Sequence, residues 1–206
     1  MDAPTGDGFA LVTGAGAGIG AAIARALAAD GLVVVLHGRR REPLERVAAD
    51  VDAAGGAARI ALADLSTREG CASLVSQVAA FTPRLRVLVH NAGVGGPTPL
   101  LDRDDSGFDL RMETNLAAPM RLTRSLLPAM ARDGRGRIIA VSSIVAKFGV
   151  PDLHAYCASK AGLVGFCRAL AKDLGRERIT VNAVLPGWTR TAMAEASWTL
   201  IGGGAG

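Results

Sequence analysis

The stretch VTGAGAGIG, residues 12–20, decides how this chain is expected to fold. It places Gly14, Gly18 and Gly20 between an apolar run and the start of a helical pattern. Glycines at such a turn let the backbone bend sharply and approach a pyrophosphate, which the N-terminus of the following helix stabilises electrostatically. The motif alone also fits a βα turn without a ligand, but its position directly after the first expected strand favours phosphate binding.

The rest of the chain alternates short β-branched runs with longer helical patterns. The short runs predict strands at 9–13, 32–37, 58–62, 86–90, 136–142 and 179–184. The helical patterns cover 19–29, 43–54, 68–80, about 108–131 and 153–174. This alternation is typical of parallel strands joined by right-handed crossovers. We therefore expect one α/β domain over residues 1–206, a doubly wound (Rossmann) parallel sheet flanked by helices, with ligands beyond the carboxyl ends of the strands.

The composition fits a globular protein without nucleic-acid or membrane partners. The 206 residues are 50% hydrophobic with a net charge of +4, and the only dense arginine cluster is GRRRE (38–42). The N-terminus has no signal-peptide pattern, and no apolar run approaches the roughly 20 residues of a membrane span. Cys71, Cys157 and Cys167 lack CxxC or metal-ligand spacing. We expect reduced thiols, no metal site and a cytoplasmic location.

Several motifs along the chain belong together. They are TGAGAGIG (13–20), ADL (63–65), HNAG (90–93), ETN (113–115), VSS (141–143), YCASK (156–160) and PGWTRT (186–191). With these motifs the sequence resembles the short-chain dehydrogenase/reductase family of the classical type, from about Phe9 to Thr191. The resemblance implies an oxidoreductase whose dinucleotide contacts Gly14, Gly18, Ile19, Gly20, Asp64, Leu65, Asn91, Ala92, Gly93, Tyr156, Lys160, Pro186, Gly187, Trp188 and Thr191.

The end of the second expected strand predicts which dinucleotide is bound. In this kind of fold an acidic side chain there binds the ribose hydroxyls and repels a 2′-phosphate. By resemblance that position falls on Gly38, which leaves space for Arg39, helped by Arg40, to bind a phosphate with its planar set of donors. We expect NADP(H) in preference to NAD(H). Arg41 fits a solvated surface arginine better.

Tyr156 and Lys160 are the expected acid and its electrostatic partner. A ketone accepts hydride only when its oxygen is polarised and receives a proton. Residues i and i+4 share a helix face, so the Lys160 ammonium can approach Tyr156 and stabilise its phenolate. Ser143, thirteen residues before Tyr156, matches the family's serine and would donate to the substrate oxygen. Ser142 points to the other side of the strand and is the weaker candidate.

Asn115 is the fourth expected catalytic residue. By resemblance its backbone carbonyl holds a water connected to Lys160. Pro119 stands four residues later and has no N–H, so the normal helical bond to that carbonyl cannot form, and we expect a local kink. The family usually has asparagine where this chain has His90. We expect no chemical role for His90, nor for the chain's other two histidines, His37 and His154.

The nearest resemblance is to reductases of 3-oxoacyl thioesters and polyketides, which implies a small-molecule or acyl-thioester ketone as substrate. An NAD-dependent dehydrogenase of the same family and a non-catalytic dinucleotide sensor are the alternatives; Gly38 and Arg39 disfavour the first. The second needs none of the catalytic residues. Small residues recur on the last helix at Ala158, Gly162, Gly165 and Ala169, which would allow close approach of another helix. Since the family commonly dimerises through this helix, the resemblance implies a homodimer or homotetramer.

The C-terminal part departs from the family. The segment TLIGGG (199–204) resembles the end of a seventh strand but comes several dozen residues early. Either the substrate-covering region after about residue 194 is missing from the protein, or residues have been omitted from the sequence there. We favour the second interpretation, which predicts a break between Ala194 and Leu200.

Overall fold

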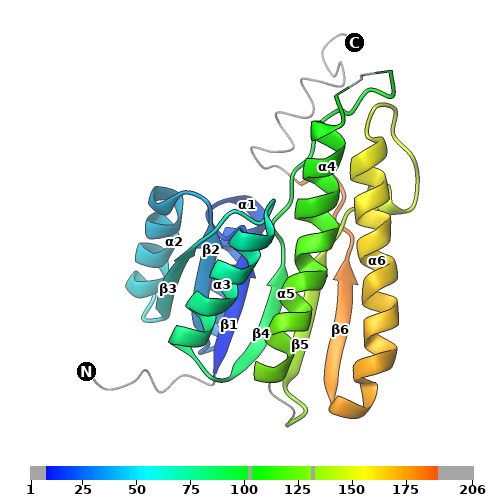
Figure 1. Ribbon diagram of the computed structural model, residues 1–206. Coiled ribbons are helices and arrows are strands. Elements are labelled where there is room, and N and C mark those ends of the chain that lie inside the picture. The colour runs from blue at the N-terminus through cyan, green and yellow to red at the C-terminus, as the bar shows by residue number, and fades with distance from the viewer. Residues whose placement is uncertain (1–7, 102–103, 131–132, 190–206) are drawn as a thin grey trace.

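The computed structural model describes residues 8–101, 104–130 and 133–189. Its centre is a six-stranded parallel sheet in the order β3-β2-β1-β4-β5-β6 (Figure 1). The strands are β1 (Phe9–Thr13), β2 (Val33–Gly38), β3 (Ala57–Leu62), β4 (Leu85–His90), β5 (Gly136–Val141) and β6 (Ile179–Val184). The order reverses between β1 and β4, and in doubly wound sheets ligands bind at that point. The expected α/β fold class is confirmed.

Helices cover both faces of the sheet. Their bounds are α1 (Gly18–Ala29), α2 (Arg41–Ala53), α3 (Arg68–Phe81), α4 (Ser106–Met112), α5 (Ala118–Leu126) and α6 (His154–Leu174). One buried cluster packs α1 and α2 against the sheet, and a second packs α3, α5 and the end of α6 against the opposite face. The strands are apolar on both faces because each face is covered, as β2 illustrates with its run VVVLHG.

The expected strands agree with the observed ones to within one residue at each end, and four of the five helices to within two. The helix expected at about 108–131 is different. It is divided into α4, a π-helical turn at Glu113–Ala117, α5, and a 3₁₀ turn at Leu127–Ala129. In the π-helical turn the N–H of Ala118 bonds to the carbonyl of Glu113, one residue beyond the normal partner. Pro119 and Pro128 explain the irregularities, since neither can donate a helical hydrogen bond.

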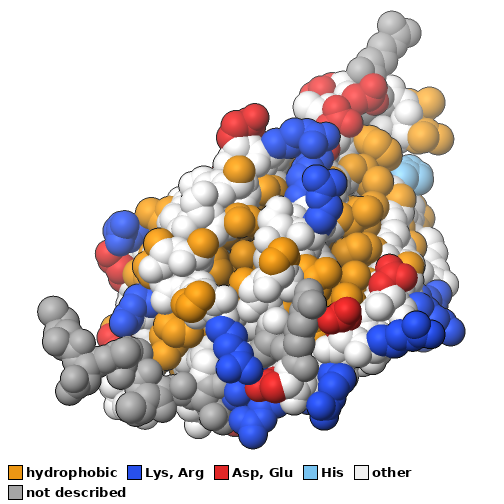
Figure 2. Space-filling view, turned by 60° about the horizontal axis from the view of Figure 1, so that its bottom comes forward, with side chains coloured by type: hydrophobic (Ala, Val, Ile, Leu, Met, Phe, Trp, Pro, Cys, Tyr) orange, Lys and Arg blue, Asp and Glu red, His pale blue; other side chains and the backbone are white. Residues whose placement is uncertain are grey.

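The surface carries large exposed apolar side chains on this same irregular helix. Phe108, Leu110 and Met120 have exposed fractions of 44%, 38% and 45%. A band of hydrophobic side chains runs over the helical face of the molecule in Figure 2. On α6, Gly162 is occupied from within the chain, because a Cβ there would lie 2.8 Å from the Leu116 side chain, whereas Gly165 has open space.

Several expectations concern absences or the chain's end. Within the described residues, no helix combines the length and apolarity needed to cross a bilayer, and no three His, Cys, Asp or Glu side chains are grouped to hold a metal. The three cysteines are free thiols, of which Cys71 and Cys167 are buried. Thr191, the expected seventh strand and the expected break between 194 and 200 lie outside the described residues.

Candidate active site

The glycine-rich turn is tied to the neighbouring strand by two side chains. The Thr13 hydroxyl donates to the Val89 carbonyl (3.1 Å) and accepts from the N–H groups of Asn91 (2.9 Å) and Ala92 (3.0 Å). The Asn91 amide in turn donates to the carbonyls of Thr13 (2.9 Å) and Gly14 (3.0 Å). These bonds hold the turn against the end of β4. Asn91 and Ala92 therefore lie beside the turn; their contact with a dinucleotide stays a prediction.

Only glycine fits the key positions of this turn. Gly14 and Gly18 have φ angles of +66° and +53°, in the left-handed region. A Cβ on Gly20 would collide with the Gly14 carbonyl and the Asn91 amide. Helix α1 begins at Gly18 with no side-chain cap from Ala17, so its first N–H groups are available at the cavity wall. An uncapped helix N-terminus behind a tight glycine turn favours a phosphate.

His37 supports the turn from below. Its Nδ1 lies 3.4 Å from the Gly14 nitrogen and its Nε2 lies 3.2 Å from the Ala63 carbonyl oxygen. Burial lowers the pKa of His37 to about 4, although the Ala63 carbonyl and Asp64 oppose this shift. The ring is therefore neutral at pH 7, with the proton on Nε2 facing the carbonyl. The role is structural, as expected from the sequence.

The carboxyl ends of β2 and β3 carry the residues expected at the adenosine end of a dinucleotide. Gly38 has no carboxylate, Arg39 and Arg40 are exposed, and Arg40 precedes α2. The Asp64 carboxylate accepts two bonds from Ser66, from its N–H (3.0 Å) and from its hydroxyl (2.9 Å). These bonds lower the pKa of Asp64, and the charge of Arg39 adds to the effect.

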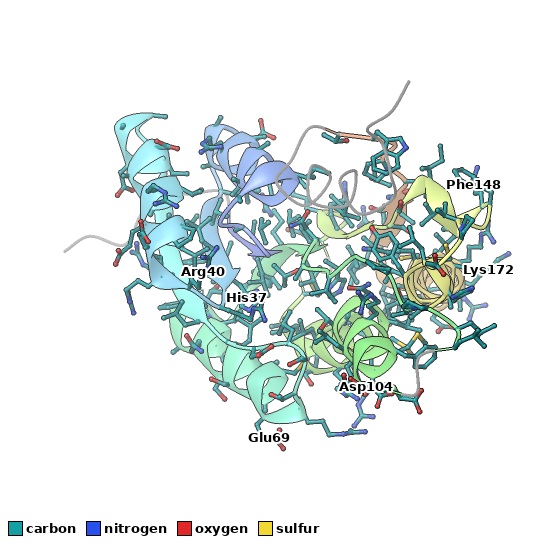
Figure 3. The ribbon with its side chains drawn as sticks, turned by 90° about the horizontal axis from the view of Figure 1, so that it is seen from above. His37, Arg40, Glu69, Asp104, Phe148 and Lys172 are labelled. Atoms are coloured by element: carbon teal, nitrogen blue, oxygen red, sulfur yellow. The ribbon has the colours of Figure 1, made fainter. Side chains whose placement is uncertain are left out.

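Those residues lie outside the main cavity but on the same edge of the sheet. Viewed from above, along the carboxyl edge, Arg40 and His37 lie on one side and Phe148 on the other (Figure 3). Asp64 is exposed and Leu65 is buried beneath it. Arg41 pairs with Glu45 at 3.8 Å on the surface, which fits the solvated role expected for it.

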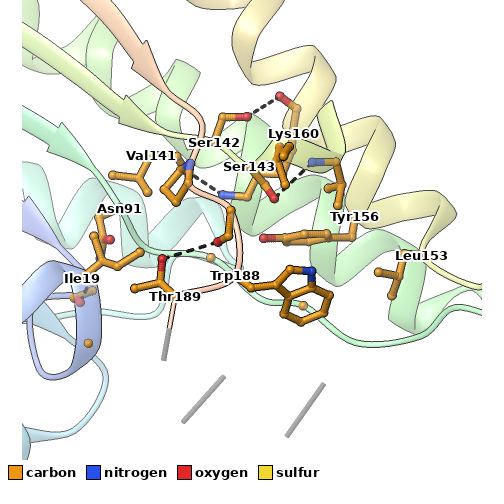
Figure 4. A pocket seen from close by; sticks show the side chains of 18 of the residues that line it. Ile19, Asn91, Val141, Ser142, Ser143, Leu153, Tyr156, Lys160, Trp188 and Thr189 are labelled. Carbon is orange, nitrogen blue, oxygen red and sulfur yellow. Dashed lines mark hydrogen bonds between the residues drawn. The ribbon is translucent and has the colours of Figure 1, made fainter. Parts of the chain in front are cut away.

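The cavity itself has a volume of about 360 Å³ and brings distant segments together (Figure 4). Its lining includes Gly14, Ala17, Gly18, Ile19, Gly20, Asn91, Ala92, Gly93, Ser143, Tyr156, Lys160, Pro186, Gly187 and Trp188. All of these except Ala17 were expected from the sequence. Apolar side chains complete the lining on one side: Ile144, Val145, Phe148, Val150 and Leu153.

Tyr156 is held in its protonated form. Burial raises the pKa of its phenol, and the Ser143 side chain partly opposes this shift. The Lys160 nitrogen lies 5.8 Å from the centre of the Tyr156 ring. Lys160 does not contribute to this shift, so the expected stabilisation of the phenolate by the lysine stays a prediction. A phenol that keeps its proton at pH 7 is the form needed to donate one.

Lys160 is a buried cation at the junction of β5 and α6. Its exposed fraction is 4%, and its Nζ donates to the Val141 carbonyl at 2.9 Å. Burial lowers the pKa of Lys160 to about 8, so the ammonium is mostly charged at pH 7. The Ser142 hydroxyl donates to the Lys160 carbonyl at 2.9 Å, which fixes the helix against the strand. Ser142 is thus occupied structurally, whereas Ser143 faces the cavity.

Asn115 connects the helix bearing it to two other segments. Its Nδ2 donates to the Val94 carbonyl (2.9 Å) and to the Ser159 hydroxyl (3.1 Å), and its Oδ1 accepts from the Val94 N–H (2.8 Å). A Cβ on Gly93 would lie 3.1 Å from that oxygen and 3.3 Å from the Lys160 nitrogen. The side chain is therefore structural, next to the lysine. The backbone carbonyl of Asn115 cannot accept a bond from Pro119.

His90 occupies the place of an asparagine in the family motif. It is buried, and its Nε2 lies 2.8 Å from the Thr123 hydroxyl. Its Nδ1 has no partner, and burial lowers the pKa of the ring to about 3. His154, on the surface, lies with Nδ1 3.1 Å from the Thr98 carbonyl oxygen. His90 fits a core role and His154 a surface role.

Sequence reasoning missed several residues of the site. Thr13 was not singled out, although a hydroxyl at the carboxyl end of the first strand was a usable signal. Thr189 lines the cavity and donates to the Gly187 carbonyl at 3.4 Å, whereas the sequence motif predicted Thr191. Phe148 lines the cavity from a loop without regular periodicity, so no pattern could place it.

Comparison with known proteins agrees with this geometry. A family model described as short chain dehydrogenase matches residues 8–200. The chain belongs to the short-chain dehydrogenase/reductase family. It is 42% identical over 186 residues to nodulation protein G of Rhizobium sp. (strain N33), covering 90% of this chain and 75% of that protein.

Two further relatives carry names that describe an activity. The 3-oxoacyl-[acyl-carrier-protein] reductase FabG of Rickettsia felis is 37% identical over 185 residues, covering 90% of this chain and 74% of that protein. The solved structure of landomycin C-6 ketoreductase LanV, with bound NADP and rabelomycin, superposes with a TM-score of 0.82 at 33% identity. The superposition covers 89% of this chain and 77% of the LanV chain. A metagenomic short-chain oxidoreductase, 39% identical with a TM-score of 0.84, was also crystallised in complex with NADP.

Proposed function

We propose that this protein is an NADP(H)-dependent ketoreductase that interconverts a ketone and a secondary alcohol. One observation carries the proposal: Ser143, Tyr156 and Lys160 line a single cavity together with the glycine-rich turn. A protein that only binds a dinucleotide has no need of this set. The family and its NADP-bound relatives support the same activity.

The residues present fit a dinucleotide with a 2′-phosphate. A Cβ at Gly14 or Gly20 would collide with neighbouring backbone, and the α1 N-terminus lacks a side-chain cap. Gly38 presents no carboxylate that would repel a phosphate, and Arg39 is exposed beside it. Asn91 to Gly93 and Pro186 to Trp188 border the rest of the cavity. Arg39 and Arg40 would bind the phosphate, and the glycine turn the pyrophosphate.

A dinucleotide held by the glycine turn and by the segments 91–93 and 186–188 would supply the hydride for the new C–H bond at the carbonyl carbon. The Ser143 hydroxyl donates a hydrogen bond to the carbonyl oxygen and polarises it. Tyr156 transfers its proton to that oxygen, which keeps the electron pair of the former C=O π bond. Lys160 stabilises the phenolate that remains, since its ammonium is mostly charged at pH 7. The Asn115 carbonyl would hold the water that returns a proton.

The substrate we propose is an apolar ketone, either a 3-oxoacyl thioester or a polyketide-like compound. The lining of the cavity includes the apolar side chains of Ile144, Phe148, Val150 and Leu153, which would contact such a ketone. Trp188, whose exposed fraction is 63%, stands at its mouth. The names of the FabG and LanV relatives support both substrate types.

The test is a cofactor oxidation assay with NADPH and NADH over panels of ketones and 3-oxoacyl thioesters. We expect turnover with NADPH preferred, and loss of turnover in Tyr156→Phe, which keeps the ring but removes the transferable proton. Full activity in Tyr156→Phe would refute the proposed acid. Preference for NADH would favour the alternative dehydrogenase, and cofactor binding without turnover by the wild type would favour the sensor.

We also propose a homodimer or homotetramer in the cytoplasm. Phe108, Leu110 and Met120 on α4 and α5 leave apolar surface exposed, and a Cβ at Gly165 on α6 would meet no other atom of this chain within 4 Å. Three free thiols suit a reducing compartment. Sedimentation showing a monomer at all concentrations would refute the assembly.

A further inference from the structure

Arg111 is a buried cation that the proposed mechanism does not use. It lies on α4 with an exposed fraction of 8%, and none of the ion pairs among the described residues involves it. Burial lowers the pKa of the guanidinium, but an arginine stays charged at any physiological pH. A buried charge without a carboxylate partner is costly, so other groups must compensate it.

Backbone carbonyls supply that compensation. Nε of Arg111 donates to the Gly96 carbonyl (3.2 Å), and Nη2 donates to the carbonyls of Gly95 (2.7 Å) and Pro97 (3.3 Å). Nη1 donates to the Gly107 carbonyl (2.5 Å), one turn earlier on the same helix. Three consecutive residues of one loop are thus held by a single guanidinium. Its planar set of five donors suits this task, whereas an ammonium has a single nitrogen.

The loop is shaped to receive the guanidinium. Gly96 has a φ angle of +98°, and a Cβ there would lie 3.0 Å from Nη2 of Arg111. A Cβ on Gly107 would lie 3.3 Å from Nη1. Side chains at these positions would displace the arginine. The glycines and Arg111 therefore form one unit.

This loop forms part of the cavity and connects two functional segments. Gly95 and Gly96 line the cavity directly after the 91–93 segment. Just before them is Val94, whose N–H and carbonyl both hydrogen-bond to the Asn115 side chain. Asn115 lies four residues after Arg111. Just after the two glycines, the Thr98 N–H donates to the Asp152 carbonyl (2.6 Å), immediately before the helix that bears Tyr156.

We propose that Arg111 is a positioning residue that fixes the backbone of residues 95–97 as the substrate-side wall of the cavity, and so controls ketone binding. The inference rests on the proposed ketoreductase function and extends it. Arg111 binds the backbone carbonyls of residues 95–97. The glycine turn that would hold the cofactor is fixed by other hydrogen bonds, those of Thr13 and Asn91. Its loss should therefore affect the ketone and not the dinucleotide.

The kinetic test compares Arg111→Met and Arg111→Lys with Arg46→Met, which removes an exposed arginine of α2 paired to Glu42. In Arg111→Met we expect the KM of the ketone to rise about tenfold or more, the effect of losing one charge-assisted hydrogen bond. The Kd of NADPH should stay within about twofold, the size of an ordinary surface effect. Arg111→Lys should lie between wild type and Arg111→Met, and Arg46→Met should match wild type. An unchanged KM in a folded Arg111→Met protein would overturn the proposal.

A second measurement, amide hydrogen exchange, does not depend on turnover. In Arg111→Met, exchange should accelerate in peptides covering residues 94–98 and stay unchanged in peptides covering 9–29. Gly96→Ala, which pushes the guanidinium away, should reproduce this local effect. Uniform acceleration over the whole chain, or none at 94–98, would overturn the positioning role. A wild-type protein that reduces no ketone would refute the proposed function instead, and the exchange data alone would then decide whether Arg111 holds the loop.

Discussion

Replacing Lys160 by methionine should remove catalysis and yet stabilise the fold at neutral pH. Burial lowers the pKa of Lys160 from 10.5 to about 8. By the relation between pKa shifts and free energy, keeping the ammonium charged in the folded state at pH 7 costs about 3 kcal/mol. Methionine keeps a similar chain length without the charge. It also leaves the Val141 carbonyl without its 2.9 Å partner, a loss of about 1 kcal/mol. We expect a net gain in unfolding free energy of about 2 kcal/mol.

The pH dependence distinguishes this explanation from better packing. Below pH 8 the lysine is protonated in both the folded and unfolded states, so the full cost applies. Between pH 8 and 10.5 the folded state has released the proton while the unfolded state still binds it, so wild-type stability rises with pH. The advantage of Lys160→Met should therefore shrink over that interval.

The assay is urea unfolding of the cofactor-free protein at pH 7, 8, 9 and 10, at one fixed protein concentration because assembly would otherwise alter the result. Lys172→Met, an exposed lysine near the end of the same helix, is the matched control and should show neither effect. If Lys160→Met is less stable than wild type at pH 7, or if its advantage does not change with pH, the reasoning is wrong.

Three other changes follow from the same structure. Gly20→Ala should lower the unfolding free energy by about 1–3 kcal/mol, because its Cβ collides with the Gly14 carbonyl, whereas Gly149→Ala, with open space around it, should have little effect in the same denaturation assay. Arg39→Asp should reverse the preference for NADPH over NADH in steady-state kinetics; an unaltered ratio would exclude Arg39 from phosphate binding. Burial lowers the pKa of His90 to about 3, so between pH 6.5 and 3 the unfolded state binds a proton that the folded state does not, and stability falls as pH falls. His90→Asn should reduce that slope by about 1.4 kcal/mol per pH unit, and an equal slope in both proteins would contradict the assignment.

Local sequence was sufficient for the order of elements and for most of the cavity. The short β-branched runs predicted every strand to within one residue at each end, because the strands are apolar on both faces and bounded by clear turns. The glycine turn was predictable because its glycines meet local requirements. Gly14 and Gly18 have positive φ angles, and Gly20 allows close approach of the backbone. Pro119 predicted an irregular helix because proline has no N–H to donate. The sequence did not predict that the irregularity would be a π-helical turn.

The tertiary structure decided the pKa of Tyr156 and the hydrogen bonds that Arg111 makes to residues 95–97. The pKa of Tyr156 is raised by burial, which depends on every segment packed around the ring. No motif or spacing in the sequence singled out Arg111; only the fold brings the Gly95–Pro97 carbonyls to its guanidinium. Residue types and their spacing along one helix or turn are fixed by the sequence itself. Burial and contacts between distant segments are not, since they exist only once the sheet has brought those segments together.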